Sequence, residues 1–257
     1  MSDKKVSFNE VLMIIGAVFI AAMFFLPLPA VVLDVFARIE FILASAILIY
    51  SLTRYSQLLP RLVLIYSGFA VGLNLSLCSL MLSGLRKGIT ESQLSFMSEK
   101  INGGLFINML FLVLFIATII FLSVGTKRVA EKAARLALDT MNQKLFDIDN
   151  EVISHNFDRV EARFLKEEIK TKIDFFSCMD GSVKFLTGSV KASLFMVLIE
   201  IAGGTLIEKY RNGKSMLESI TNAVALTTEN VKLFLPSLVL VSIAIGFKIT
   251  KQSREEA

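Results

Sequence analysis

The chain has 257 residues, of which 54% are hydrophobic and only 19% are charged, and its mean hydropathy is +0.65. A soluble domain of this size cannot bury that much apolar surface, so this composition excludes a disordered chain and argues strongly against a soluble enzyme. The formal net charge of +4 is small and scattered along the chain, so we predict no nucleic-acid partner and expect an integral membrane protein.

Six segments are long and apolar enough to cross a bilayer as helices, each of which needs roughly 20 residues. In chain order they are residues 11–28, 30–50, 62–85, 105–124, 186–206 and 231–247. The expected fold class is therefore all-α, a polytopic transmembrane helical bundle with about six spans. The positive charges of the short loops are nearly equal on the two sides, so they do not fix the orientation.

A polar insert separates the fourth span from the fifth. We therefore divide the chain into residues 1–124 with spans one to four, a helical cytoplasmic loop at 125–185, and residues 186–257 with the last two spans and a short tail. Within the insert we expect two amphipathic helices, joined by a solvated acidic connector at 147–151. Their apolar positions are Val129, Ala133, Leu136 and Thr140 in the first helix, and Leu165, Ile169, Ile173 and Phe176 in the second.

Several charged residues fall inside the predicted spans, among them Asp34, Arg38, Glu40 and Glu200. A charge at the bilayer centre costs roughly 2.5–3.5 kcal/mol on insertion scales, so such residues usually face a partner or a water-filled cavity. Asp34 and Arg38 share one helical face, where they could form a structural ion pair or line an ion or proton path. Glu40 and Glu200 could likewise pair across helices.

The sequence gives little support to catalysis. It contains no zinc-binding H-E-x-x-H motif, no Walker loop and no G-x-S-x-G elbow. The single histidine, His155, leaves little room for histidine-based catalysis or metal binding. We therefore predict no enzymatic activity, no metal and no cofactor.

Two blocks of the insert carry a specific resemblance. The first is GTKRVAEKAARLALDTMNQKLFDID at 125–149, and the second is MDGSVKFLTG at 179–188. Shorter matches are LPLP at 26–29 followed by Asp34, the pair Leu73-Asn74, and the paired glycines Gly203-Gly204. Together these stretches closely resemble the FHIPEP family, the large membrane component of the export gate in flagellar and virulence-type type III secretion. The resemblance covers about residues 12–250, in order and with compatible spacing.

The resemblance implies a cellular location and a function. Members of the family are understood to form nonameric rings in the bacterial inner membrane, to couple the proton motive force to protein export, and sometimes to have eight spans. By resemblance, Lys144, Asp149 and Asp180 match loop positions implicated in that coupling. Alternatively, these residues hold the fold of the loop or an intersubunit contact. The implied partners are other export-gate membrane subunits, further copies of the chain in a homo-oligomeric ring, and exported proteins.

The sequence also departs from the family pattern. Ala70 and Ser79 replace two arginines of the third span, Glu40 replaces an asparagine, and Ser189 replaces an aspartate. We expect a membrane-only form, whose large cytoplasmic domain could be supplied by a separate chain. Two functions stay open: an energy-coupling gate subunit, or a degenerate, non-energising paralogue that acts as a structural or regulatory partner of the export apparatus. An independent carrier is a third possibility, which the insert argues against.

Overall fold

The computed structural model describes residue 23 and residues 28–53, 57–87, 104–154 and 159–255. These residues form helices and short connections and contain no strand, which confirms the all-α fold class. The helices are α2 (Ala30–Leu52), α3 (Leu59–Arg86), α4 (Gly104–Ile153), α5 (Arg159–Arg211) and α6 (Met216–Glu255).

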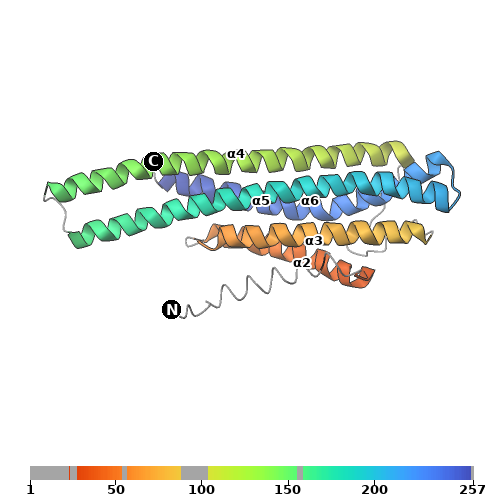
Figure 1. The fold of residues 1–257 in the computed structure, drawn as a ribbon, viewed down its shortest axis with the longest axis horizontal. Helices are drawn as coiled ribbons and strands as arrows, with labels where there is room; N and C mark the ends of the chain where they lie inside the picture. The colour runs from red at the N-terminus through yellow and green to blue at the C-terminus, as the bar shows by residue number, and fades with distance from the viewer. Residues whose placement is uncertain (1–22, 24–27, 54–56, 88–103, 155–158, 256–257) are drawn as a thin grey trace, which may run out of the picture.

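Two of the helices are much longer than a bilayer is thick. α4 has 50 residues and α5 has 53, which correspond to about 75 and 80 Å at 1.5 Å per residue. They run antiparallel and form a long hairpin, and one end of this hairpin projects beyond the bundle that α2, α3 and α6 make with them (Figure 1). Because the hydrocarbon core is only about 30 Å thick, a large part of each helix must lie outside the membrane.

Four of the described helices are long and apolar enough to span a membrane, namely α3, α4, α5 and α6. α2 coincides with the predicted second span, but it carries the charges of Asp34, Arg38 and Glu40. The predicted first span, 11–28, lies almost entirely outside the described residues. A multi-pass membrane protein is therefore confirmed, whereas the total of six spans stays a prediction.

The two long helices pass without interruption through the boundaries that the sequence predicted at 124/125 and 185/186. The acidic stretch 147–151 belongs to the last turns of α4, so the prediction of a connector there was wrong. No glycine or proline occurs between residues 126 and 180, so nothing in the sequence stops the helix earlier. Ile148 is also buried within this stretch, which ties it to the hairpin.

The hairpin is held by a seam of buried residues from both helices. On α4 these are Ala130, Ala134, Ala137, Met141 and Ile148, and on α5 they are Ala162, Phe175, Phe176, Met179 and Val183. The small alanines of α4 lie on the same seam as the large aromatic and aliphatic side chains of α5, a complementary arrangement that lets two helices pack closely.

The sequence predicted the buried face of one hairpin helix correctly and that of the other with an error of one residue. On the second amphipathic helix the predicted stripe is confirmed, because Phe176 is buried and the other predicted positions are partly buried. On the first helix the buried face lies one residue further along the chain than predicted. Val129 and Leu136 are 42% and 59% exposed, while Ala130 and Ala134 are buried. The larger side chains of Val129 and Leu136 had suggested the buried face, but α5 packs against the smaller side chains of Ala130 and Ala134.

At the opposite end of the molecule, a glycine of α5 permits close contact with two other helices. A Cβ atom added to Gly204 would lie 2.9 Å from Leu85 Cδ1 of α3 and 3.2 Å from Ala223 Cβ of α6. Nearby, the Asn212 side-chain amide donates a hydrogen bond to the Leu85 carbonyl oxygen at 2.9 Å. These contacts join α3, α5 and α6 at the end away from the projecting hairpin (Figure 1).

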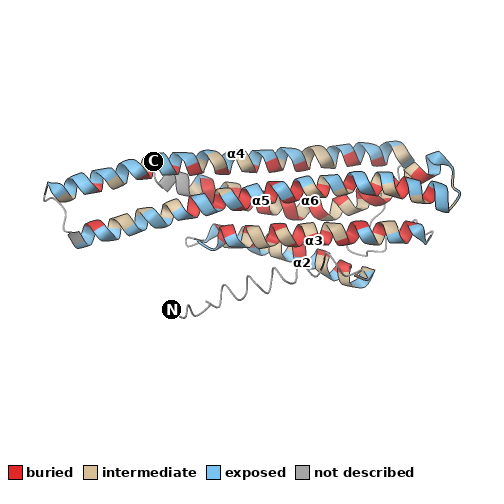
Figure 2. Cartoon of the chain, in the orientation of Figure 1, coloured by how far each residue is buried: buried red, intermediate tan, exposed pale blue. Residues whose placement is uncertain are grey.

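The end that faces the projecting hairpin is closed by a buried lysine. Lys248 of α6 is 2% exposed, and its Nζ donates to the carbonyl oxygen of Thr53, directly after α2, at 3.2 Å. The end of α2 and the last turns of α6 therefore lie on the same side of the bundle as the hairpin (Figure 1). Burial is concentrated where the five helices meet, whereas the projecting part of the hairpin is largely exposed (Figure 2).

Candidate functional site

An ion pair links the two helices near the tip of the hairpin. The Lys166 ammonium of α5 donates to Asp149 Oδ1 of α4, and both side chains are partly exposed. Exposed pairs of this kind contribute at most about 1 kcal/mol, because water and salt screen them. The contact therefore shows which residues of α4 and α5 lie opposite each other, but it adds little to the stability of the hairpin.

Asp180 lies further along α5, close to the bundle. Its Oδ2 accepts a hydrogen bond from Lys184 Nζ at 2.6 Å, one helical turn away. Its Oδ1 is buried and accepts no hydrogen bond from the described part of the chain. The hydrogen bond to Asp180 raises the pKa of Lys184, so the lysine stays charged at neutral pH.

Two further charges face this pair from α4. The Arg135 guanidinium donates to Glu131 Oε1 at 2.7 Å, and both side chains interact electrostatically with Lys184. Glu131, Arg135, Asp180 and Lys184 thus form a group of four charges where the hairpin approaches the bundle, which we call the hairpin charge cluster. Sequence analysis did not single out Glu131 or Arg135, although both lie in the AEKAAR stretch of the first family-like block.

The three loop residues that the family resemblance singled out do not come together in this chain. Lys144 is exposed on α4. Lys166, the partner of Asp149, lies about 21 Å along α5 from Asp180 at 1.5 Å per residue. The structure therefore places Asp149 at the hairpin tip and Asp180 in the hairpin charge cluster, and their roles stay predictions.

Inside the bundle, Asp34 and Arg38 pair within α2. Arg38 Nη2 donates to Asp34 Oδ2 at 2.9 Å, with the arginine side chain 53% exposed and the aspartate 13% exposed. The two residues share a helical face, as their spacing indicated. This geometry suits a structural ion pair at a helix surface, and an ion path stays a prediction.

Glu40 joins three helices through one oxygen atom. Its Oε1 lies 2.7 Å from Ser237 Oγ of α6 and 3.2 Å from the Tyr66 hydroxyl of α3, and both groups can donate to it. Tyr66 and Ser237 are also 3.0 Å apart, and all three residues are buried. Ser237 follows Pro236, which removes one backbone donor inside α6 and loosens the helix at this point.

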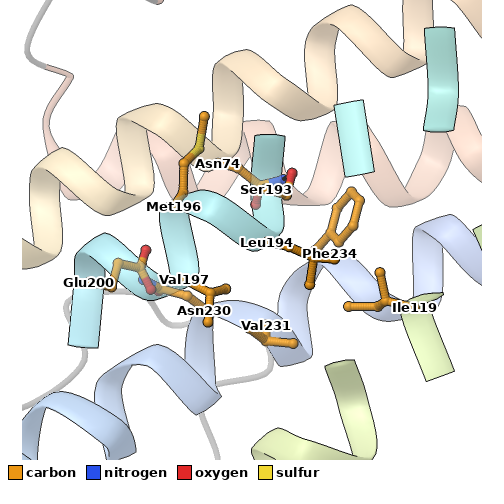
Figure 3. A pocket seen from close by; sticks show the side chains of 10 residues that line it. All are labelled: Asn74, Ile119, Ser193, Leu194, Met196, Val197, Glu200, Asn230, Val231 and Phe234. Atoms are coloured by element: carbon orange, nitrogen blue, oxygen red, sulfur yellow. Dashed lines mark hydrogen bonds between the residues drawn. The ribbon is translucent and has the colours of Figure 1, made fainter. Parts of the chain in front are cut away.

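Glu200 of α5 lies at a second buried polar site, where it meets Asn230, which lies two helical turns before Ser237 on α6. Its Oε1 accepts a hydrogen bond from Asn230 Nδ2 at 3.1 Å, and its Oε2 is buried and accepts none from the described residues. A cavity of about 20 Å³ adjoins the carboxylate (Figure 3). Its polar lining comes from Asn74, Ser193, Glu200 and Asn230, and apolar side chains such as Ile119 and Phe234 close the rest.

Comparison with known proteins identifies the chain. The sequence profile of the FHIPEP family matches residues 20–257. The chain belongs to the FHIPEP family. No solved structure matches it.

Several curated proteins are similar to this FHIPEP chain. Flagellar biosynthesis protein FlhA of Borreliella burgdorferi is 33% identical over 253 residues, which cover 95% of this chain and 36% of that protein. Low calcium response locus protein D of Yersinia pestis is 29% identical over 158 residues, or 61% of this chain and 22% of that protein. Secretion system apparatus protein SsaV of Salmonella typhimurium is 31% identical over 158 residues, or 61% and 23%. The chain thus spans little more than a third of the first of these relatives and less of the others.

The FHIPEP motifs fall on both parts of the molecule. The two long blocks lie on opposite arms of the hairpin, while Asn74 and Gly204 lie in the bundle, where Asn74 bonds to Ser193 and Gly204 allows close helix contact. The membership that these motifs indicated is confirmed. The roles of Asn230 and Ser237 were not predicted from the sequence, although their two-turn spacing within an apolar helix was a visible signal.

Proposed function

We propose that this chain is a non-enzymatic membrane subunit of a type III protein-export gate in the bacterial inner membrane. The observation that carries the proposal is the FHIPEP match over residues 20–257, which includes the whole described bundle and hairpin. The names of the relatives, which refer to flagellar biosynthesis and to a secretion system, support the same general role.

The proposed topology has six spans, with the hairpin on the cytoplasmic side. Residues 11–28 and α2 add two spans to the four apolar helices. An even number puts both termini on the hairpin side. Lys248 and Thr53, which meet at that end of the bundle, agree with this arrangement.

The proposed mechanism is coupling of the proton motive force to export. Two features support it. Carboxylates lie buried inside the membrane part, at Glu40 and Glu200. α4 and α5 also run unbroken from that part to the hairpin charge cluster. Because a continuous helix is stiff along its axis, a change of charge or packing in the bundle would move the cluster.

The proposed partners are further copies of this chain in a ring, other gate subunits and exported proteins. The membrane part of α4 supports contact with neighbours, because only 17% of its most apolar 18-residue stretch is buried. Large side chains such as Phe106 and Phe121, 80% and 78% exposed, are available there to lipid or to an adjacent subunit.

A tagged pull-down from gently solubilised native membranes tests the proposal, with an unrelated tagged multi-pass protein as control. We expect mass spectrometry to find other export-gate subunits specifically with this protein. Recovery of none of them would contradict a role in the gate.

A further inference from the structure

The cavity between α3, α4, α5 and α6 adjoins a buried carboxylate, only one of whose oxygen atoms has a hydrogen-bond partner among the described residues. Glu200 is 3% exposed, and its Oε1 is bonded to Asn230, but Oε2 has no partner among the described residues. A buried polar atom without a partner costs about 1–3 kcal/mol, so such an atom calls for an explanation.

The neighbouring space suits water. A cavity needs only about 10–15 Å³ to hold one water molecule, provided that two to four polar groups can bind it. This cavity measures about 20 Å³ and is lined by the side chains of Asn74, Ser193 and Asn230 beside the carboxylate. Asn74 Nδ2 already donates to Ser193 Oγ at 3.0 Å, which orients the two groups on the wall opposite Asn230 (Figure 3).

Among the described residues, the groups that surround Glu200 are uncharged. α6 contributes the hydrogen-bonding side chains of Asn230 and Thr227, and α4 contributes Ile119 to the cavity wall. α3 contributes the thiol of Cys78, the titratable group that interacts electrostatically with Glu200. An ionised carboxylate in such surroundings is poorly stabilised, whereas a neutral carboxylic acid could donate to a bound water.

We propose that Glu200 is a proton-binding site, whose carboxylate takes up and releases one proton through water held in this cavity. In the step, Oε2 accepts a proton from a hydronium ion that reaches the cavity, leaving water, and the carboxyl later returns the same proton to water. The site changes by one unit of charge and no other bond is made or broken. This inference rests on the proposed function, because it names the residue of the bundle at which the proton motive force would act.

Glu40 does not share these features. Its Oε1 accepts hydrogen bonds from both Tyr66 and Ser237, and it does not line the cavity. The structure therefore assigns proton exchange to Glu200, and a packing role to Glu40.

Infrared difference spectroscopy of the full chain in lipid nanodiscs tests the site. A pH step should change a carboxylic C=O band at the high frequency of a carboxyl in apolar surroundings. We expect Glu200→Gln to remove this band and Glu218→Gln, a change at an exposed position in the first turn of α6, to retain it. An unchanged spectrum in Glu200→Gln would overturn the proposal.

A second variant tests the site independently, in case Glu200→Gln does not fold. Asn74→Leu keeps the carboxylate but removes an amide of the cavity wall. The carboxylic band should then shift in frequency, and the O–H stretching band of the cavity water, which is recognised by its shift in water labelled with ¹⁸O, should be lost. If the carboxylic frequency and the water band both stay as in the wild type, the cavity water is not the route and the proposal fails.

A parallel assay separates failure of this inference from failure of the proposed function. In the source bacterium, Glu200→Gln should lower protein secretion to the level of a deletion strain, while Glu218→Gln should secrete normally. If deletion itself leaves secretion unchanged, the proposed export role fails, whatever the spectra show. If deletion abolishes secretion but Glu200→Gln secretes normally, the export role stands and the proton site is refuted.

Discussion

At the scale of single residues, the hydroxyl groups of Tyr66 and Ser237 share one acceptor atom, Glu40 Oε1. Both hydroxyls point at Glu40 Oε1 from helices that are far apart in sequence, and all three side chains are excluded from solvent. Without the carboxylate, the Tyr66 hydroxyl could still donate to Ser237 Oγ and Ser237 Oγ to the Phe234 carbonyl oxygen, but neither of these contacts reaches α2. The contact therefore ties α2 to α3 and α6.

Replacing Glu40 by alanine should destabilise the protein more than replacing it by glutamine. Alanine removes the shared acceptor and leaves a cavity between the helices, and each hydrogen bond lost costs about 0.5–1.5 kcal/mol in addition to the lost packing. Glutamine keeps a carbonyl oxygen that can accept one of the two hydrogen bonds. Thermal unfolding in detergent, followed by circular dichroism, should give a clearly lower Tm for Glu40→Ala and a smaller decrease for Glu40→Gln. Equal and unchanged Tm values in both variants would contradict the network.

The sequence predicted that Glu40 and Glu200 would face the protein interior, but it could not name their partners. The rule that intramembrane charges avoid lipid is local, and it applies to each residue alone. The partners of Glu40 lie on α3 and α6, so their identity depends on how the helices pack. The cavity beside Glu200 has the same origin, because it is lined by residues of four different helices. No pattern within one segment contains that information.

At the scale of elements, the hairpin depends on small residues along α4. Ala134 is 6% exposed and lies on the same seam as Phe175, Phe176 and Met179 of α5. A larger side chain at this position would push the helices apart.

We expect Ala134→Phe to loosen the hairpin and Leu136→Ala to leave it intact. Overpacking a well-packed seam typically costs about 1–3 kcal/mol. Leu136 is 59% exposed, so its truncation removes little packing. Hydrogen exchange measured by mass spectrometry should become faster across 126–150 and 160–182 in Ala134→Phe only. Faster exchange in Leu136→Ala with normal exchange in Ala134→Phe would show that the opposite face of α4 is the packed one.

The helical pattern predicted both arms of the hairpin but placed one of them with an error of one residue. Alanine, valine and leucine all count as apolar, so periodicity alone allowed two neighbouring stripes on α4. The aromatic partners on α5 decide between them, since only small side chains leave room for Phe175 and Phe176. The acidic turns at the end of α4 were misplaced for a related reason, because charge indicated a loop while the seam residue Ile148 keeps the segment helical.

At the scale of the whole molecule, the unbroken course of α4 and α5 connects the bundle to the hairpin charge cluster. Six spans and a separate soluble loop were the natural prediction from hydropathy, because hydropathy changes sharply near residue 125. Helix continuity does not follow hydropathy. A helix satisfies its own backbone hydrogen bonds in lipid and in water alike, so it can cross the boundary without a break.

This continuity predicts how the molecule responds to a flexible insertion. Three glycines inserted after Gly125 would interrupt α4 at the start of the hairpin, because glycine costs about 1 kcal/mol per residue in a helix. We expect secretion to be lost while the protein still reaches the membrane in normal amount. The same insertion after Ser154, where α4 has ended, should be tolerated. Normal secretion with the insertion after Gly125 would show that the rigid connection is not needed.

The most direct test of the proposed coupling role is protein secretion by cells that carry Asp180→Asn in place of the wild-type chain. Asp180 is the half-buried carboxylate of the hairpin charge cluster, and asparagine keeps its shape while removing its charge. Asp174→Asn, an exposed change on the same helix, is the matched control. With equal amounts of protein in the membrane, we expect Asp180→Asn to abolish secretion and Asp174→Asn to leave it normal. Normal secretion by Asp180→Asn would contradict the proposed coupling role of the hairpin charge cluster.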